Sequence, residues 1–314
     1  MTQRRFVLSS AALAAASMWA RRVPAAVLPP TADGAPLSAD ERALHALNRL
    51  GYGPRPADAA AIAAEGAGPW LERFLTEQLT PRRLAPPEAL TERLDSLEVL
   101  RLSQAELLGR YREATQAARQ ARRDQAQGMA ADADALNAVR EQIRPLVAQA
   151  ATARLARALQ SPAQLEEVLT EFWFNHFNVF AGKNAVGVLL ADYEQRAIRP
   201  HVLGRFRDML GATARHPAML IYLDNAQSVA PGYVPPQRAR RLAQARPELQ
   251  ARLPAGLNEN YARELMELHT LGVHGGYSQT DVRELARILT GWTIGPQSPD
   301  GFRFAPRAHD DRSE

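Results

Sequence analysis

The residues with the clearest potential for chemistry lie close together in the sequence, between Asn258 and Gly272. On a helix with about 100° per residue, Glu264 falls between Leu268 and Leu271 and therefore lies within an apolar stripe. A carboxylate in such a stripe loses hydration, so it must be protonated, paired with a cation or bound to a metal ion. Glu267 shares the helix face of Glu264 at the i, i+3 spacing, as paired carboxylates do in metal-binding helix bundles.

The residue types define two groups of candidates and one structural alternative. The catalytic candidates come from this segment and from one earlier helix: Glu264, Glu267, His269 and His176. The first three could also hold a divalent metal ion, but the sequence does not identify a cofactor. Candidates for ligand binding are Asn258, Asn260, Arg263, Asp281, Arg287 and His201. Alternatively, charged residues of the segment form ion pairs that organise two packed helices, namely Arg263, Glu264, Glu267, Asp281, Glu284 and Arg287.

Sequence motifs disfavour several classes of enzyme, but they do not decide between a catalytic, a ligand-binding and a structural role for these residues. The Glu-x-x-His pair of di-iron bundles is absent, because Thr270 follows Glu267 at that spacing and Met266 precedes His269. His-Glu-x-x-His, Gly-x-Ser-x-Gly, a phosphate loop and a dinucleotide fingerprint are also absent from the sequence, which disfavours serine hydrolases, nucleotide hydrolases and dehydrogenases. The chain has no cysteine, so it has neither a thiolate metal site nor a thiol nucleophile.

His176 lies in an aromatic segment that predicts a core helix. Ser161-Pro162 with Gln164 matches a capping box with proline at the first helical position. One face of the following helix carries Leu165, Val168, Leu169, Phe172, Val179 and Phe180. We therefore expect Phe172 to be buried, and His176 to be either a hydrogen-bonded core imidazole or a ligand or acid/base group.

The elements that must position these residues are mainly helices. The composition, 46% hydrophobic and 23% charged, is that of a globular protein. Residues 97–160 are dominated by good helix formers and predict a long helical hairpin, with Gly128 and Pro145 as the strong breakers. Residues 226–256 contain five prolines and predict an exposed connection. We expect one helical domain, residues 38–314, as a multi-helix array with at most a minor strand at Phe302 to Phe304.

The first 25 residues predict a signal peptide. Arg4-Arg5 and Arg21-Arg22 flank an uncharged segment, Phe6 to Ala20, that is too short to span a membrane. Paired arginines before this segment favour the twin-arginine route, and residues 26–37 would form a linker after cleavage. These arginines carry the formal net charge of +4, so the mature chain would be neutral and binding to nucleic acid is disfavoured. We expect a periplasmic or extracellular protein without a transmembrane helix in the mature chain.

Several blocks of sequence resemble a bacterial family named domain of unknown function 1800 (DUF1800). The main blocks are Asn258 to Val273, Gly276 to Trp292, and Pro217 to Asn225; further matches are His45 to Pro54, Phe172 to Phe177, and Arg199 to Arg207. The resemblance covers about residues 40–310. It implies an exported, mostly helical bacterial protein without an established activity, so it identifies no catalytic residue.

The sequence departs from this family pattern in two places. Residues 226–256 are longer than the usual connection before the Asn258 block. The chain also ends soon after Phe304 and His309-Asp310, where members of the family continue with a further helical portion. We therefore expect the sequence to be truncated at its C-terminal end.

Two hypotheses about function remain open at this point. The first is an exported enzyme that gathers Glu264, Glu267 and His269 with His176 or His201 around a metal ion or a substrate proton. The second is a noncatalytic envelope scaffold that binds another exported protein through its arginine-rich hairpin or residues 226–256. Export alone fits both hypotheses, and the sequence does not establish whether the protein is an enzyme.

Overall fold

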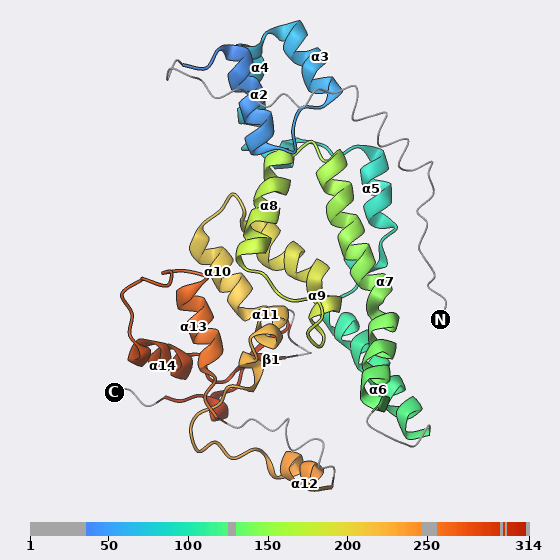
Figure 1. Ribbon diagram of the computed structural model, residues 1–314, viewed down its shortest axis with the longest axis vertical. Coiled ribbons are helices and arrows are strands. Elements are labelled where there is room, and N and C mark those ends of the chain that lie inside the picture. Colours follow the sequence, from blue (N-terminus) through green and yellow to red (C-terminus); the bar gives the residue numbers. More distant parts are fainter. Residues whose placement is uncertain (1–35, 125–129, 246–255, 296–297, 299, 312–314) are drawn as a thin grey trace, which may run out of the picture. The chain divides into compact units, whose positions relative to one another are not determined.

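The computed structural model describes residues 36–124, 130–245, 256–295, 298 and 300–311 (Figure 1). This part of the chain contains thirteen α-helices and one antiparallel pair of short strands. The expected mainly α fold with a minor β element near the C-terminal end is confirmed. The expected signal peptide, residues 1–25, lies outside the described residues, as does most of the expected linker, residues 26–37. The described residues form two compact units, one with 36–49 and 53–72 and the other with 50–52 and 73–311.

The smaller unit is formed by α2 (Ala39–Leu50), α3 (Pro56–Glu65) and the first part of α4 (Ala67–Gln78). Ser38 and Glu41 begin α2 with a reciprocal cap. The Ser38 N–H donates to Glu41 Oε2 at 2.8 Å, and the Glu41 N–H donates to Ser38 Oγ at 3.3 Å. Such a cap satisfies backbone donors that have no partner in the first helical turn. Gly53 makes the turn after α2 at φ +96°, a conformation that other residues rarely adopt.

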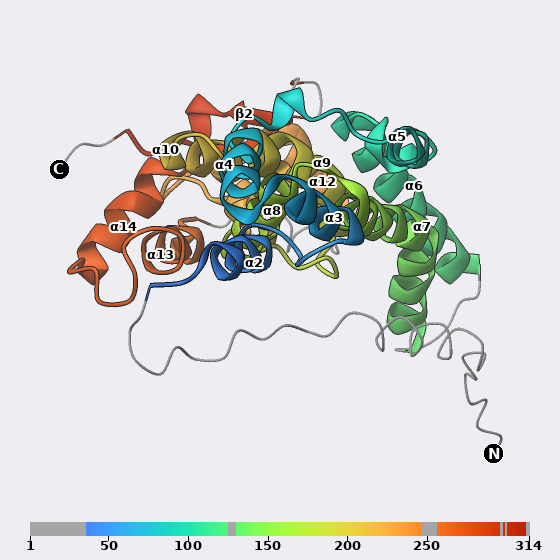
Figure 2. The same cartoon turned by 90° about the horizontal axis from the view of Figure 1, so that it is seen from above.

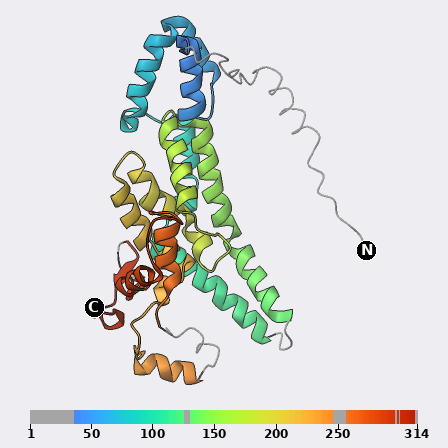
Figure 3. The ribbon, with the colours of Figure 1, turned by 60° about the vertical axis from the view of Figure 1, so that its left-hand side comes forward.

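A long helical hairpin dominates one side of the larger unit. After α5 (Glu88–Asp95), the helices α6 (Gln104–Asp124) and α7 (Ala130–Gln160) lie side by side (Figures 1 and 3). Both helices contribute small and aliphatic side chains to the hydrophobic core: Leu107, Ala114, Ala118, Val139, Ile143, Leu146 and Ala150. The hairpin expected within residues 97–160 is thus confirmed. Pro145 lies inside α7 without ending it, and Gly128 lies outside the described residues.

The most deeply buried helix of the larger unit is α9 (Val186–Tyr193), which follows α8 (Gln164–His176). Apart from Asp192, α9 carries no charge, as expected of a helix surrounded by protein. It continues into a π turn, Glu194–Ile198, in which the Arg199 N–H donates to the Glu194 carbonyl. Because a π turn bonds residues five apart instead of four, it brings Glu194 and Arg199 onto one side of the helix.

The start and the exposed face of α8 differ from the expectation. The helix begins at Gln164 without a capping box, and the Gln164 side chain instead donates to the carbonyl groups of Ala158 and Ser161. Phe172 is 56% exposed, so the prediction that it belongs to the core is wrong. The buried face of α8 instead includes Glu167. This carboxylate can be buried because Arg199 neutralises its charge.

The larger unit is completed by shorter elements: α10 (Phe206–Arg215), α11 (Pro217–Tyr222), α12 (Gln237–Ala245), α13 (Glu259–Glu267), α14 (Gln279–Ile288), β1 (Trp292–Ile294) and β2 (Phe302–Phe304). The strands pair antiparallel with Trp292 opposite Phe304. Helices α13 and α14 lie side by side (Figure 2). Within residues 226–256 the structure describes α12 but not residues 246–255. Among the described helices, none is both long and apolar enough to span a membrane.

Candidate functional site

A cleft of about 570 Å³ lies between α7, α8 and the π turn after α9. We call it the α7–α8 cleft. It is lined by Tyr52, Ala151, Arg154, Leu155, Ala158, Leu159, Glu167, Thr170, Glu171, Asn175, Glu194 and Arg199. All of these residues belong to the larger unit. The cleft therefore combines a strongly charged set of side chains with two leucines and two alanines.

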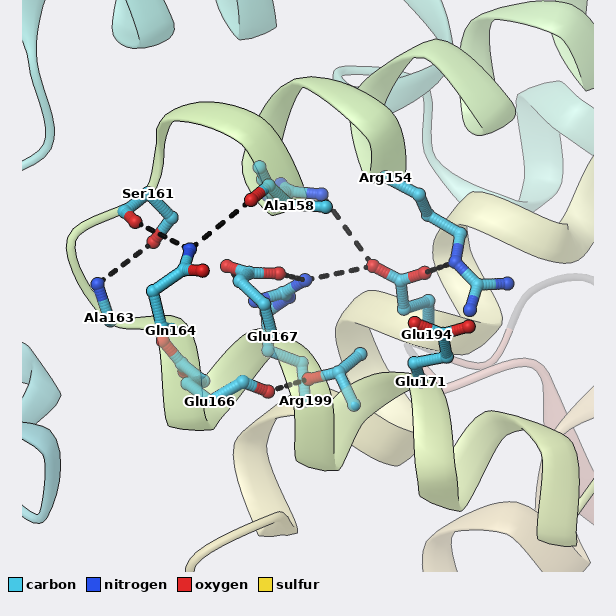
Figure 4. A network of polar contacts seen from close by, with 12 residues as sticks. Arg154, Ala158, Ser161, Ala163, Gln164, Glu166, Glu167, Glu171, Glu194 and Arg199 are labelled. Carbon is cyan, nitrogen blue, oxygen red and sulfur yellow. Dashed lines mark hydrogen bonds and ion pairs between the residues drawn. The ribbon is translucent and has the colours of Figure 1, made fainter. Parts of the chain in front are cut away.

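Arg199 joins the two buried carboxylates of the cleft (Figure 4). Its Nη1 and Nη2 atoms donate to Glu167 Oε1 and Oε2 at 2.9 and 2.7 Å, and Nη2 also donates to Glu194 Oε1 at 3.0 Å. The Glu167 and Glu194 side chains are 6% and 4% exposed, and that of Arg199 is 16% exposed. A two-point bond between guanidinium and carboxylate fixes the orientation of both groups. The π turn supplies Glu194 and Arg199, and α8 supplies Glu167.

Two further arginines from α7 share the Glu194 carboxylate. Arg154 Nε lies 3.2 Å from Glu194 Oε2, and Arg157 Nη1 lies 3.7 Å from Glu194 Oε1. Arg154 also stacks over the Phe174 ring at 4.4 Å from its centroid. Three guanidinium groups thus surround two buried carboxylates.

Burial and charge act in opposite directions on the arginines of this network. Burial alone would lower the pKa of Arg199, but its hydrogen bonds with Glu167 and the charges of Glu167 and Glu194 raise it. For Arg157, burial and then the positive charge of Arg199 lower the pKa, against the smaller effect of the glutamates. Burial also raises the pKa of the neighbouring Glu166. The glutamates therefore stabilise the charged form of Arg199 more strongly than that of Arg157.

Tyr52 and Glu171 form a polar contact at the edge of the cleft. The Tyr52 hydroxyl donates to Glu171 Oε2 at 2.7 Å, and its backbone N–H donates to Gln164 Oε1 at 3.3 Å. Burial, and next the hydrogen bond with Glu171, raise the pKa of Tyr52, so the phenol remains a donor at neutral pH. Leu155 and Leu159 on α7 are 61% and 65% exposed and present an apolar wall.

Of the catalytic candidates, the structure brings His176 and His269 together. His176 Nε2 donates to the His269 carbonyl at 3.0 Å, and the ring centroids are 6.4 Å apart. His269 is 7% exposed, and its ring packs against that of Phe177 with 5.3 Å between centroids. Burial, and then the nearby His176, lower the pKa of His269 to about 4.

This pKa predicts a pH-dependent loss of stability. Above about pH 6.5 His269 is neutral in both the folded and the unfolded chain. Between about pH 6.5 and pH 4 the unfolded chain binds a proton that the folded protein does not, so the free energy of unfolding falls as the pH falls. Urea unfolding at pH 7 and pH 5 should show a smaller difference for His269→Gln than for the unmodified protein. Equal differences would show that His269 does not titrate in this way.

Glu264 and Glu267 do not occupy the buried position that the helical wheel predicts. Both are half-buried, and within the described residues neither carboxylate makes a hydrogen bond or ion pair. Leu268 and Leu271 are 57% and 56% exposed, so the expectation of a buried apolar stripe is wrong. The helix α13 ends at Glu267, whereas the helical wheel assumed that the helix continues as far as Leu271. In the described part of the chain, no group of three or more His, Asp or Glu side chains could hold a metal ion, so Glu264, Glu267 and His269 are not gathered into a metal site.

Glu264→Gln should therefore change the free energy of unfolding by less than about 0.5 kcal/mol, as substitutions away from buried partners usually do. Thermal or urea unfolding of the two proteins would test this. Glu167→Gln is the informative contrast, because the Glu167 carboxylate is buried and bonded to Arg199. A loss of several kcal/mol for Glu264→Gln would indicate a buried partner for its carboxylate.

Most of the binding candidates have structural roles in α13 and α14. The Asn258 side chain caps α13 by accepting from the Asn260 N–H at 2.9 Å, and Asp281 caps α14 in a reciprocal box with Ser278. Arg263 donates to Gln279 on α14 at 2.8 Å. The side chain of Asn260 is exposed.

Arg287 and His201, the remaining binding candidates, lie elsewhere in the larger unit. Arg287 pairs with Glu284 at 2.9 Å and with Asp310 at 3.2 Å. Neither contact joins α13 to α14, and the ion pair between these two helices is instead that of Arg283 with Glu259 at 3.3 Å. His201 is half-buried in the turn Arg199–His201, and its ring makes no hydrogen bond with other described residues.

Comparison with known proteins gives one match. The family described as Protein of unknown function (DUF1800) matches residues 45–314. The chain belongs to the DUF1800 family. No curated protein and no solved structure matches the chain. The family assignment confirms the resemblance but assigns no activity to the DUF1800 chain.

Sequence reasoning missed the residues that form the α7–α8 cleft of this DUF1800 chain. Tyr52 and Arg199 lie in blocks that carry the family resemblance, but neither was a site candidate. The signal that could have identified Glu194 is its position directly after the apolar helix α9, where a charge is difficult to bury without a partner.

Proposed function

We propose that this DUF1800 chain is an exported binding protein whose α7–α8 cleft receives a small amphipathic molecule. One observation carries the proposal: each of the three carboxylates in the cleft is already bonded by a protein donor. Glu167 and Glu194 pair with Arg199, and Glu171 accepts from Tyr52. Such groups are poorly suited to act as a free general base or metal ligand, whereas they build a rigid polar surface.

The size and the wall of the cleft support the same function. Small-molecule sites are typically clefts of about 300 to 1,000 Å³ with apolar walls and a few placed polar groups. The α7–α8 cleft, at about 570 Å³, falls within this range. Leu155 and Leu159 expose more than half of their surface on its wall, and a bound molecule would cover them.

Binding of an uncharged, environment-sensitive dye such as Nile red would test the proposal. The unmodified protein should bind the dye, and Leu159→Asp should weaken binding at least tenfold by placing a charge on the apolar wall. Leu79→Asp is the matched control, because Leu79 is 64% exposed, against 65% for Leu159, and does not line the cleft. Equal affinities of the two variants, or no binding by the unmodified protein, would contradict the proposed function.

A second candidate function is acid/base catalysis at the His176–His269 pair. The observation that favours it is the contact of two imidazoles from distant segments. The lowered pKa of His269, about 4, argues against it as a general base at neutral pH, since efficient bases have a pKa near the working pH. Loss of any measured activity in His269→Gln without loss of dye binding would favour this candidate.

Export is part of the proposal and gives a separate prediction. Changing Arg4 and Arg5 to lysine should stop accumulation of the protein in the periplasm of a bacterial host, because the twin-arginine route requires the arginine pair. The matched control changes Arg21 and Arg22 to lysine and should leave export intact. Immunoblots of periplasmic and cytoplasmic fractions would measure the outcome. Undiminished export of the first variant, or export in cells without the twin-arginine translocase, would contradict this route.

A further inference from the structure

A second cavity, of about 220 Å³, adjoins the α7–α8 cleft. We call it the inner cavity. The two share Ala151, Arg154 and Glu194 in their walls. The other residues of the inner cavity are apolar except Arg157: Leu100, Val147, Ala150, Ala153, Phe174, Val179, Ala181, Leu190 and Ala191. The lining of the inner cavity is therefore mostly apolar, and its charged side chains are those of Arg154, Arg157 and Glu194.

Arg157 is the least satisfied of these charged groups. Its side chain is 14% exposed, and its one ion pair with another described residue joins Nη1 to Glu194 Oε1 at 3.7 Å, which is longer than a hydrogen bond. A guanidinium carries five N–H donors. Among the described residues no Arg157 nitrogen is both fully buried and without a partner, so the donors that make no hydrogen bond remain accessible to a ligand. Arg157 thus lines the inner cavity with bonding capacity that the protein does not use.

Two of the arginines around the inner cavity share one carboxylate. Arg154, Arg157 and Arg199 face the carboxylates of Glu167 and Glu194. Arg199 takes both Glu167 oxygens, so Arg154 and Arg157 depend on Glu194 alone. The Glu166 carboxylate also acts on Arg157, but it is half-buried and makes no ion pair with another described residue.

We infer that the inner cavity binds an amphiphile with one carboxylate head group and a short aliphatic chain. This inference rests on the proposed function of the cleft and names its class of ligand. The head group would accept hydrogen bonds from Arg157, because guanidinium and carboxylate match in a two-point geometry. The chain would lie against the apolar wall between Val147, Phe174 and Leu190.

The volume of the inner cavity limits the length of that chain. An apolar cavity of about 150 Å³ holds one benzene molecule, so by proportion the inner cavity has room for roughly six to nine heavy atoms. Octanoate is a suitable probe, because the seven carbons beyond its carboxylate fall within this range. Arg154, held aside by its stacking on Phe174 and by Glu194, would remain beside the head group.

Calorimetric titration with octanoate, 1-octanol and octylammonium would test the inference. The unmodified protein should bind octanoate at least tenfold more tightly than octanol and should not bind octylammonium. Arg157→Gln should lower the affinity for octanoate at least tenfold and leave the affinity for octanol unchanged. Arg144→Gln is the matched control on the same helix, because Arg144 is 75% exposed and lies outside both cavities.

The outcomes separate this inference from the proposed function. If octanoate and octanol bind equally, or if Arg157→Gln binds octanoate like the unmodified protein, the carboxylate site is refuted while apolar binding in the cleft stands. If neither probe nor the uncharged dye binds, both proposals are refuted. Ala151→Trp gives an independent test should Arg157→Gln not fold, because Ala151 is exposed and lines both cavities. Its bulky ring should abolish octanoate binding, and unchanged binding would refute the assigned position.

Discussion

Replacing Arg199 by methionine should lower the free energy of unfolding by about 3 to 5 kcal/mol. The substitution removes the charge that faces Glu167 and Glu194, whose side chains are 6% and 4% exposed. Glu194 keeps Arg154 and Arg157, whereas Glu167 loses its one ion-pair partner among the described residues. A carboxylate removed from water without a partner is strongly unfavourable, and this accounts for the size of the effect.

The matched control for this prediction is Arg110→Met. Arg110 pairs with Glu98 at 2.8 Å, close to the distances in the Arg199 network, but the two side chains are 55% and 44% exposed. Exposed pairs of this kind contribute about 0 to 1 kcal/mol. Urea unfolding followed by circular dichroism would measure both variants. A cost for Arg199→Met as small as that for Arg110→Met would contradict a buried network.

The double variant Glu167→Met and Arg199→Met separates charge from packing. It should be more stable than Arg199→Met alone, because Glu167 is then no longer buried without a partner. Apolar residues of similar volume often replace a buried ion pair with little loss of stability. If the loss of stability of the double variant, relative to the unmodified protein, equalled the sum of the losses of Glu167→Met and Arg199→Met, the two side chains would not be energetically coupled.

Local sequence signals predicted much of the fold for identifiable reasons. Good helix formers between recognisable breakers predicted the α6–α7 hairpin, because helix propensity and termination are properties of neighbouring residues. The same local rules failed for α8. These rules assigned Phe172 to the core. They gave no sign that the helix face with Glu167 can be buried because Arg199 pairs with this carboxylate. A helical wheel shows only neighbouring residues, so it cannot show the pair of Glu167 and Arg199, which lie 32 residues apart.

The candidate site was less predictable than the fold. The wheel drawn around Glu264 assumed a helix longer than α13, which ends at Glu267, and it treated Leu268 and Leu271 as buried. The π turn that aligns Glu194 with Arg199 has no equivalent sequence signal, because it depends on packing around α9. Residue types suggested that either His176 or His201 could join His269, and the structure places His176 against the backbone carbonyl of His269.

Phe177→Ala should cost about 3 to 5 kcal/mol, the range for removing a fully buried aromatic ring. Phe177 has 0% of its surface exposed. Its ring centroid lies 6.0 Å from those of Trp173 and Phe206 and 5.3 Å from that of His269. The Tyr193 hydroxyl donates to the Phe177 carbonyl at 2.8 Å, and this bond survives the substitution because it involves only the backbone of Phe177. The expected loss therefore measures the cavity that the missing ring leaves.

Phe172→Ala removes the same ring from the same helical segment and is the natural control. Because Phe172 is 56% exposed, its loss should cost less than about 1 kcal/mol. Urea unfolding of the two variants would compare a buried and an exposed phenylalanine five residues apart in the sequence. If Phe172→Ala were the more costly change, the face of α8 predicted from the helical wheel would be the buried one. In that case the Glu167–Arg199 pair could not lie on the buried face of this helix. The α7–α8 cleft would then lack the buried charged groups described above.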